Sequence, residues 1–283
     1  MAYGREKPTS PPRPPQPETV FDKLTNYADY SGLKWVHNAQ HPRSFAHDEI
    51  MFMISGQVLE LWFRLLKHEL GGARERIRAD DLPMAFKMMA RAKRVLETMT
   101  TMWSIMDTMT PTEFGAFRDY LGDASGFHSY MYRHVEYIMG TKSFSMAKQH
   151  EGTGQVFDEL MEALHQPSLY DEALRLLARR GVPVPAEALE RDWSLPYKLN
   201  QGVEDAWLTV FEDARPANEL YQLVEELTDL ADIFGQWRQR HVTSVERQIG
   251  YKTGTAGTSG VEFLRRIAQQ RFFPELWTVR TRL

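Results

Sequence analysis

The chain contains no cysteine among its 283 residues. Disulfides, iron–sulfur clusters, cysteine-based zinc sites, catalytic thiols and thiolate-ligated haem are therefore all excluded. Any metal must be held by nitrogen or oxygen donors. Nine histidines are present, but none lies in a His-Glu-x-x-His motif or a comparable metal-ligand spacing. His37 and His41 are four residues apart, yet Pro42 argues against pairing them on a helix. A metal site built from several side chains is a weak candidate.

The sequence also lacks long apolar runs and basic stripes. No stretch of about 18 uninterrupted apolar residues appears, and the amino terminus has no apolar signal core, so neither a membrane span nor secretion is predicted. With 34 Lys+Arg against 38 Asp+Glu the formal net charge is only -4. No basic stripe is interleaved with aromatics, which argues against a nucleic-acid partner. We expect a cytoplasmic protein that binds neither nucleic acid nor a membrane.

Alternating polar and apolar residues, the pattern of a half-buried strand, are nearly absent. A hydrophobic content of 42% can furnish a sizeable core. Residues 1–20 are rich in proline and poor in apolar side chains, which predicts a disordered tail. We therefore expect one all-α domain over residues 21–283, a bundle of long helices.

Apolar spacing of three and four residues predicts a helix over about 48–70. Further helices are expected over about 83–108, 113–121, 127–138, 156–180, 202–213 and 217–249. A terminal helix should begin after Ser259, which has capping-box spacing to Glu262. Gly56 lies in the middle of the first helix, where glycine costs roughly 1 kcal/mol relative to alanine. It marks either a close helix–helix crossing or room for a ligand.

The most distinctive stretch runs from His241 to Gly260, where a histidine on a helix precedes a loop rich in glycine and threonine. An isolated helical histidine is more often a core or surface residue than a ligand. The loop, taken by itself, reads equally well as a flexible linker. Upstream, Ser125 is a candidate N-cap for the helix that begins near residue 127. Arg118 by itself would be read as a surface ion-pair partner.

Three blocks together resemble the tryptophan 2,3-dioxygenase family of haem proteins. They are HDEI (47–50) with QVLELW (57–62), FRDYLGDASGF (117–127), and WRQRH (237–241) with GYKTGTAGTSG (250–260). The order and spacing of the blocks match too, and the resemblance runs from about residue 24 to 260. It implies a mainly helical homotetramer with long helices around a haem pocket. Such proteins bind haem b and L-tryptophan and insert dioxygen across the indole 2,3 bond.

The resemblance assigns roles to individual residues. His241 matches the proximal histidine that ligates the haem iron, a role suited to a neutral imidazole. Arg118 matches the arginine that clamps the substrate carboxylate with its planar two-pronged donor. Thr255 matches the threonine that meets the substrate ammonium, in a loop expected to fold over the site. Ser125 and Gly126 match the turn beside the haem propionate.

The resemblance also implies the walls of the substrate pocket. Phe52, Phe114 and Leu121 match the apolar residues around the indole, although each reads equally well as ordinary core. Tyr27 and Tyr30 match two aromatics of an amino-terminal arm that reaches into the neighbouring subunit's pocket. We therefore expect the oligomer to complete the active site.

The sequence departs from the family at one position. Family members have a distal histidine that hydrogen-bonds the indole N–H, and counting back from Gln57 puts that position at Gly56, preceded by Ser55. The related indoleamine dioxygenases place serine there, so oxygen insertion does not demand a base. Loss of one such hydrogen bond is worth only about 1 kcal/mol. We therefore count Gly56 and Ser55, with Arg118 and Thr255, among the residues that decide the chemistry.

Two reaction outcomes and two other functions stay open at this point. The indole of L-tryptophan, or of a substituted one such as β-methyl-tryptophan, is either cleaved to an N-formylkynurenine or monooxygenated to an oxindole-type product with an external reductant, as in natural-product relatives. A non-catalytic haem- or indole-binding paralogue is the alternative, but retention of both Arg118 and Thr255 argues against it. The third interpretation is a haem-free helical oligomer, which would show no Soret band.

Overall fold

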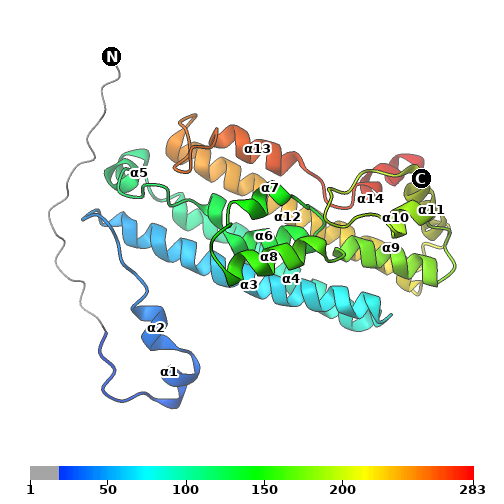
Figure 1. Cartoon of the computed structure of the whole chain (residues 1–283), viewed down its shortest axis with the longest axis horizontal. Helices are drawn as coiled ribbons and strands as arrows, with labels where there is room; N and C mark the ends of the chain where they lie inside the picture. Colours follow the sequence, from blue (N-terminus) through cyan, green and yellow to red (C-terminus); the bar gives the residue numbers. More distant parts are fainter. Residues whose placement is uncertain (1–18) are drawn as a thin grey trace.

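The computed structural model describes residues 19–283 as helices joined by loops, with no β-strand in that range. The two longest helices are α3 (Asp48–Arg78) and α12 (Glu219–Ile249), each of 31 residues, and α4 (Leu82–Met106) has 25. Helix α4 packs against both of the others along the length of the molecule (Figure 1). The predicted all-α fold is confirmed.

Shorter elements cover the three long helices and close the two ends of the bundle. They are α1 (Asn26–Tyr30), α2 (Leu33–His37), α5 (Pro111–Arg118), η1 (Gly126–His128), α6 (Tyr130–Ile138), α7 (Phe144–Lys148), α8 (Gln155–His165), α9 (Leu169–Arg179), α10 (Ala186–Leu189), α11 (Gln201–Phe211), α13 (Val261–Gln269), α14 (Glu275–Thr278) and η2 (Val279–Arg282). Helices α1 and α2 stand off from the bundle as an amino-terminal arm, defined here as residues 26–40 (Figure 1).

Side-chain caps set where several of these helices begin. The Asp81 carboxylate accepts a hydrogen bond from Met84 N at the start of α4. Helix α5 opens with a complete capping box between Thr110 and Glu113. Such caps satisfy backbone donors that a helix start leaves free, and each contributes about 1 kcal/mol.

Two predictions about helix ends were wrong. The single helix expected over 156–180 is interrupted at Pro167, which has no amide hydrogen to continue the ladder. Ser168 then starts α9 afresh through a capping box with Asp171. The capping box expected at Ser259 does not form, because α13 begins after Gly260 without a side-chain cap.

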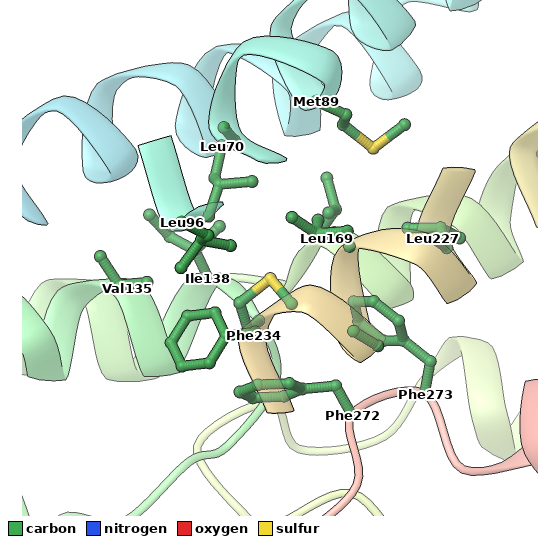
Figure 2. Packing of buried hydrophobic residues seen from close by; sticks show 14 of the residues in the cluster. Leu70, Met89, Leu96, Val135, Ile138, Leu169, Leu227, Phe234, Phe272 and Phe273 are labelled. Carbon is green, nitrogen blue, oxygen red and sulfur yellow. The ribbon is translucent and has the colours of Figure 1, made fainter. Parts of the chain in front are cut away.

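The core between α3, α4, α9 and α12 is built from interdigitated aliphatic and aromatic side chains (Figure 2). Leu70, Leu96, Leu169 and Phe234 are completely buried there. Burying one side chain of this size stabilises the fold by about 1.5–3 kcal/mol. Met89 of α4 is also fully buried, and its flexible side chain fills the core between these helices.

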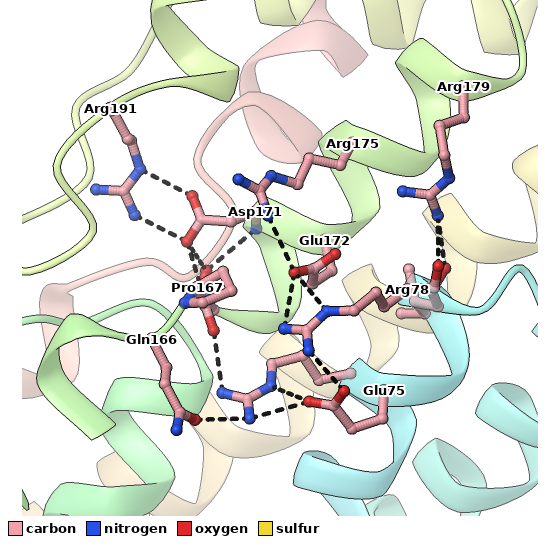
Figure 3. A network of polar contacts seen from close by, with 12 residues as sticks. Glu75, Arg78, Gln166, Pro167, Asp171, Glu172, Arg175, Arg179 and Arg191 are labelled. Carbon is pink, nitrogen blue, oxygen red and sulfur yellow. Dashed lines mark hydrogen bonds and ion pairs between the residues drawn. The ribbon is translucent and has the colours of Figure 1, made fainter. Parts of the chain in front are cut away.

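At one end of the bundle, a network of ion pairs and hydrogen bonds joins α9 to α3 (Figure 3). The buried Glu172 carboxylate accepts hydrogen bonds from Arg78 Nε at 3.1 Å and Arg175 Nη1 at 3.4 Å. Asp171 receives two from Arg191, at 2.8 and 3.0 Å. Arg78 lies roughly 33 Å along α3 from Gly56, at the helix rise of about 1.5 Å per residue.

Most of the predicted tail, residues 1–18, lies outside the described residues. The extent of the single domain, 21–283, stays a prediction. Among residues 19–283, no helix is both long enough and apolar enough to span a membrane.

Candidate active site

A cavity of about 940 Å³ opens between α3, α5, α6, α12 and the loop that follows α12. This volume is near the upper end for small-molecule pockets. Its wall is mostly apolar, with Phe52, Leu59, Phe63, Trp103 and Ile267 among the lining residues. The cavity can therefore hold a large flat apolar group as well as a smaller polar ligand.

His241 lies on the α12 wall of this cavity. Its imidazole stacks on the indole of Trp103, with ring centroids 4.6 Å apart and planes inclined by 8°. Trp237 flanks it at 5.7 Å. Burial lowers the pKa of His241 to about 4, so the ring is neutral near pH 7 and keeps a nitrogen lone pair for a metal.

Three polar side chains of α12, Arg240, Ser244 and Gln248, hold this face of the helix against the end of α4. Asp107 forms an ion pair with Arg240 and accepts a hydrogen bond from Ser244 Oγ at 2.7 Å. The Gln248 amide donates to the backbone carbonyls of Met106 and Met109, at 2.9 and 2.6 Å. Because these contacts bracket His241 along the helix, they fix the direction from which its ring enters the cavity.

The wall fits the haem that the resemblance implies. A haem needs a wide apolar slot and at least one axial donor, and the cavity supplies both, with His241 as its one histidine among the described residues. Within residues 19–283, no three His, Asp or Glu side chains come together in a way that could hold a bare metal ion. His241 is therefore the candidate iron ligand.

Arg118 lines the same cavity from the end of α5. Its guanidinium donates a hydrogen bond to the backbone carbonyl of Thr253 and forms no ion pair with any described residue. Glu113, the acidic residue in the first turn of the same helix, caps the start of α5 through Thr110. The positive charge of Arg118 is thus left for a ligand carboxylate.

The loop after α12 folds back on itself and onto the turn that follows α5. Gly254 N donates to Thr258 O at 3.1 Å. Thr255 Oγ1 donates to Ala124 O at 2.9 Å, which joins segments 131 residues apart. These hydrogen bonds hold the loop in place, with Thr255 beside the same cavity as Arg118. The interpretation of the loop as a flexible linker is therefore wrong.

Gly260 is one position in this loop that only glycine fits. Its φ is +61°, and a Cβ there would lie 2.5 Å from the carbonyl oxygen of Lys252. We expect Gly260→Ala to cost about 1–3 kcal/mol through backbone strain and to weaken L-tryptophan binding about tenfold or more by opening the loop. The tryptophan-induced change in the haem spectrum measures the affinity.

Gly115→Ala is the matched control for Gly260→Ala, because it lies inside α5 and a Cβ there meets nothing within 4 Å. It should leave tryptophan affinity unchanged and add up to about 1 kcal/mol of stability. Equal affinities for Gly260→Ala and the unmodified protein would show that the loop does not cover the ligand.

Ser125 and Gly126 line the cavity at the turn between α5 and α6. Ser125 Oγ accepts a hydrogen bond from Phe127 N at 3.3 Å and caps the short η1 turn. The prediction that it caps the following helix is wrong, because Ser129 caps α6. At this turn a propionate of a bound haem could meet the Ser125 hydroxyl and the uncovered backbone of Gly126.

Phe52, Phe114 and Leu121 form part of the apolar wall, as expected. Phe117 was missed from the sequence. It is completely buried and packs against both other phenylalanines, with ring centroids 5.5 Å from Phe52 and 5.3 Å from Phe114. Phe117 follows Phe114 by three residues on a helix, and this spacing could have predicted that both face the pocket wall.

Gly56 and Ser55 also face the cavity from α3. A Cβ added to Gly56 would meet nothing within 4 Å. This excludes the close helix–helix crossing as the reason for glycine and leaves room for a ligand. Ser55 is the buried hydroxyl beside that space.

Tyr27 and Tyr30 do not line the cavity of their own chain, and they are 71% and 93% exposed. Their role in a neighbouring subunit stays a prediction. The arm instead contributes Trp35 and Gln40 to the cavity wall, and the Gln40 amide donates to Gln57 Oε1 of α3 at 2.7 Å. No pattern in the sequence indicates these arm contacts.

Several known proteins resemble this chain over nearly its whole length. The family model described as tryptophan 2,3-dioxygenase matches residues 15–283. The tryptophan 2,3-dioxygenase of Polaromonas sp. is 50% identical over 93% of this chain and 90% of the relative. That of Ralstonia pickettii is 48% identical over 93% of this chain and 95% of the relative, and that of Burkholderia lata is 49% identical over 93% and 85%. Because the match spans nearly the whole chain and includes the blocks that line the cavity, the chain belongs to the tryptophan 2,3-dioxygenase family.

Proposed function

We propose that this chain is a haem-dependent oxygenase that uses O2 on the indole C2–C3 bond of L-tryptophan or a substituted tryptophan such as β-methyl-tryptophan. One observation carries the proposal: a single cavity brings together the neutral His241, the unpaired Arg118 and Thr255. A metal donor and an amino-acid clamp in one apolar space are what this chemistry requires. Membership of the family supports the same activity.

A haem b held by His241, with Ser125 and Gly126 beside it, would supply the binding and activation of O2. The Arg118 guanidinium would take the substrate carboxylate through two parallel N–H donors. Thr255 already uses its hydroxyl hydrogen on Ala124 O, so its oxygen lone pairs are free to accept from the substrate ammonium.

The apolar walls do the remaining positioning. Phe52, Phe114 and Leu121 would confine the indole ring, while Phe117 behind them keeps two of these side chains in place. Holding the ring near the reactive centre removes much of the entropic cost of bringing the reactants together. The same walls keep water away from a reactive oxidised intermediate.

Gly56 offers no side chain to the indole N–H, and its open space is what supports a substituted substrate. It also leaves two product classes in contention. One is ring cleavage to an N-formylkynurenine, in which both oxygen atoms of O2 are retained. The other is a monooxygenated oxindole-type product, in which one atom is retained and an external reductant supplies electrons.

Turnover under labelled O2 tests the proposal. We expect the reduced protein to consume O2 with L-tryptophan and β-methyl-tryptophan and to place label in the product, as read by mass spectrometry. Two labelled atoms mean ring cleavage and one means monooxygenation. No O2 consumption with either substrate would refute the oxygenase and favour the non-catalytic haem- or indole-binding paralogue.

Gly56→His should raise the proportion of doubly labelled product, because it returns a hydrogen-bond partner to the indole nitrogen. One such bond is worth about 1 kcal/mol, or about fivefold in a product ratio. Gly56→Ala is the control, since it adds a methyl group into the same open space without a polar atom.

We further propose that the protein is a homotetramer in which Tyr27 and Tyr30 of one copy enter a neighbour's pocket. Their exposure, on an arm that stands off from the bundle, supports this arrangement. Two exposed tyrosines would gain burial by such an exchange.

A further inference from the structure

The space beside Gly56 is not filled by the residues next to it in the sequence. A Cβ added at Gly56 would meet nothing within 4 Å, and Ser55 before it has a short side chain. The Gln57 side chain after it is bound to the arm instead. Its amide donates to Ala39 O at 2.9 Å, and its Oε1 accepts from the Gln40 amide at 2.7 Å. Neither neighbour therefore replaces the side chain that glycine lacks.

Phe52 lies one helical turn before Gly56, on the same face of α3. Its ring is held between two aromatic rings of α5, with centroids 5.7 Å from Phe114 and 5.5 Å from Phe117. Because these contacts keep Phe52 in place, its ring does not turn into the space beside Gly56. The open space is thus a continuation of the apolar wall expected to confine the indole, one turn further along α3.

The expected orientation of the substrate presents one edge of the indole to this space. Arg118 and Thr255 would hold the amino-acid end of the molecule. A haem bound to His241 from the α12 wall would leave the α3 wall to the substrate. Gly56 stands where the histidine of other family members would meet the indole N–H, so the edge that carries N1 faces the space. C7 is the next free ring position on that edge.

The chemistry of the wall favours an apolar group in this space. The cavity lining is mostly apolar, and the Gln57 amide beside it is already hydrogen-bonded. A polar substituent placed there would lose its water without gaining a partner. A methyl group or a halogen would instead gain affinity by burial, by about fourfold for one carbon.

We propose that the space beside Gly56 is a specificity pocket for tryptophans that carry a small apolar substituent on N1 or C7 of the ring. This proposal rests on the indole oxygenation proposed above and names the class of substrate. A β-methyl group makes a different demand, because Cβ lies between the ring and the clamp formed by Arg118 and Thr255. The two kinds of substituent can therefore be tested separately.

A substituent at either position is compatible with the proposed reaction. Oxygen is added at the C2–C3 bond, and no bond to a group on N1 or C7 is formed or broken. The substituent therefore passes unchanged into the product. An N1-methyl group removes the N–H, which has no side chain to meet at Gly56.

Binding of ring-methylated tryptophans tests the pocket, and isothermal titration calorimetry measures it without requiring turnover. We expect 1-methyl- and 7-methyl-L-tryptophan to bind the unmodified haem protein at least as tightly as L-tryptophan, and up to about fourfold more tightly. 5-Methyl-L-tryptophan is the ligand control, because C5 lies on the far side of the ring from N1.

Gly56→Leu fills the space with an apolar side chain and adds no hydrogen-bonding group. It should weaken binding of the 1-methyl and 7-methyl compounds about 10- to 100-fold through steric overlap. Its affinities for L-tryptophan and the 5-methyl compound should change little. Gly56→His should give the same order, and Gly115→Ala, whose added methyl group lies away from any neighbour, should leave all four affinities unchanged.

The pocket proposal is overturned if Gly56→Leu weakens L-tryptophan as much as its 1-methyl and 7-methyl forms, or if the 5-methyl compound alone is rejected. O2 consumption, measured in parallel, separates it from the proposed function. Tight binding of the ring-methylated compounds without O2 consumption supports the pocket and refutes the oxygenase. Turnover of L-tryptophan with rejection of both the 1-methyl and 7-methyl compounds refutes the pocket alone, and failure to bind any indole amino acid refutes both.

Discussion

Replacement of His241 with alanine is expected to abolish haem binding, and the Soret band of the purified protein should disappear. The reason is geometric, because His241 is the one histidine on the described cavity wall and the apolar residues around it supply no other iron donor. The loss should exceed 100-fold in haem affinity. Absorption spectroscopy with haem titration into the apoprotein measures it.

The control for this change is His165→Ala, which removes an exposed histidine at the end of α8. A second variant, His241→Gly, should regain the Soret band when imidazole is added, since the freed space beside Trp103 can admit the detached ring. A Soret band that survives in His241→Ala without imidazole would mean that another group ligates the iron.

Arg118→Ala should lower kcat/KM for L-tryptophan about 100- to 1,000-fold, which corresponds to about 3–4 kcal/mol for a lost guanidinium–carboxylate pair. No acidic side chain in residues 19–283 pairs with this guanidinium, so its charge is available to the substrate. Steady-state O2 consumption gives the rate, and the tryptophan-dependent shift of the haem spectrum gives the affinity.

Tryptamine provides the internal check for Arg118, because it carries the indole and the amine but no carboxylate. Arg118→Ala should leave the much slower turnover of tryptamine unchanged. Arg118→Lys should recover only part of the tryptophan rate, since an ammonium cannot make the two parallel bonds. If tryptophan and tryptamine lose activity equally, Arg118 supports the pocket rather than the carboxylate.

The long helices could be predicted because their signals are local. Steps of three and four between apolar residues indicate α3, α4 and α12 without knowledge of their neighbours. The break between α8 and α9 was missed because amphipathic spacing continues through Pro167, and only its missing amide hydrogen ends the helix.

The site could be predicted only in part from the residues themselves. His241, Arg118 and Thr255 entered through the resemblance, since isolated residues of these types are common. Trp103 was missed because its importance lies in a contact between two helices. A tryptophan becomes notable only when the structure stacks it on His241.

The empty surroundings of Gly56 bear on how this enzyme could have diverged. A substitution there is not opposed by any neighbouring atom, so a side chain can be lost or regained in one step without compensating changes in the core. The core therefore does not oppose a larger residue at Gly56. Removing a mid-helix glycine should itself add up to about 1 kcal/mol of stability.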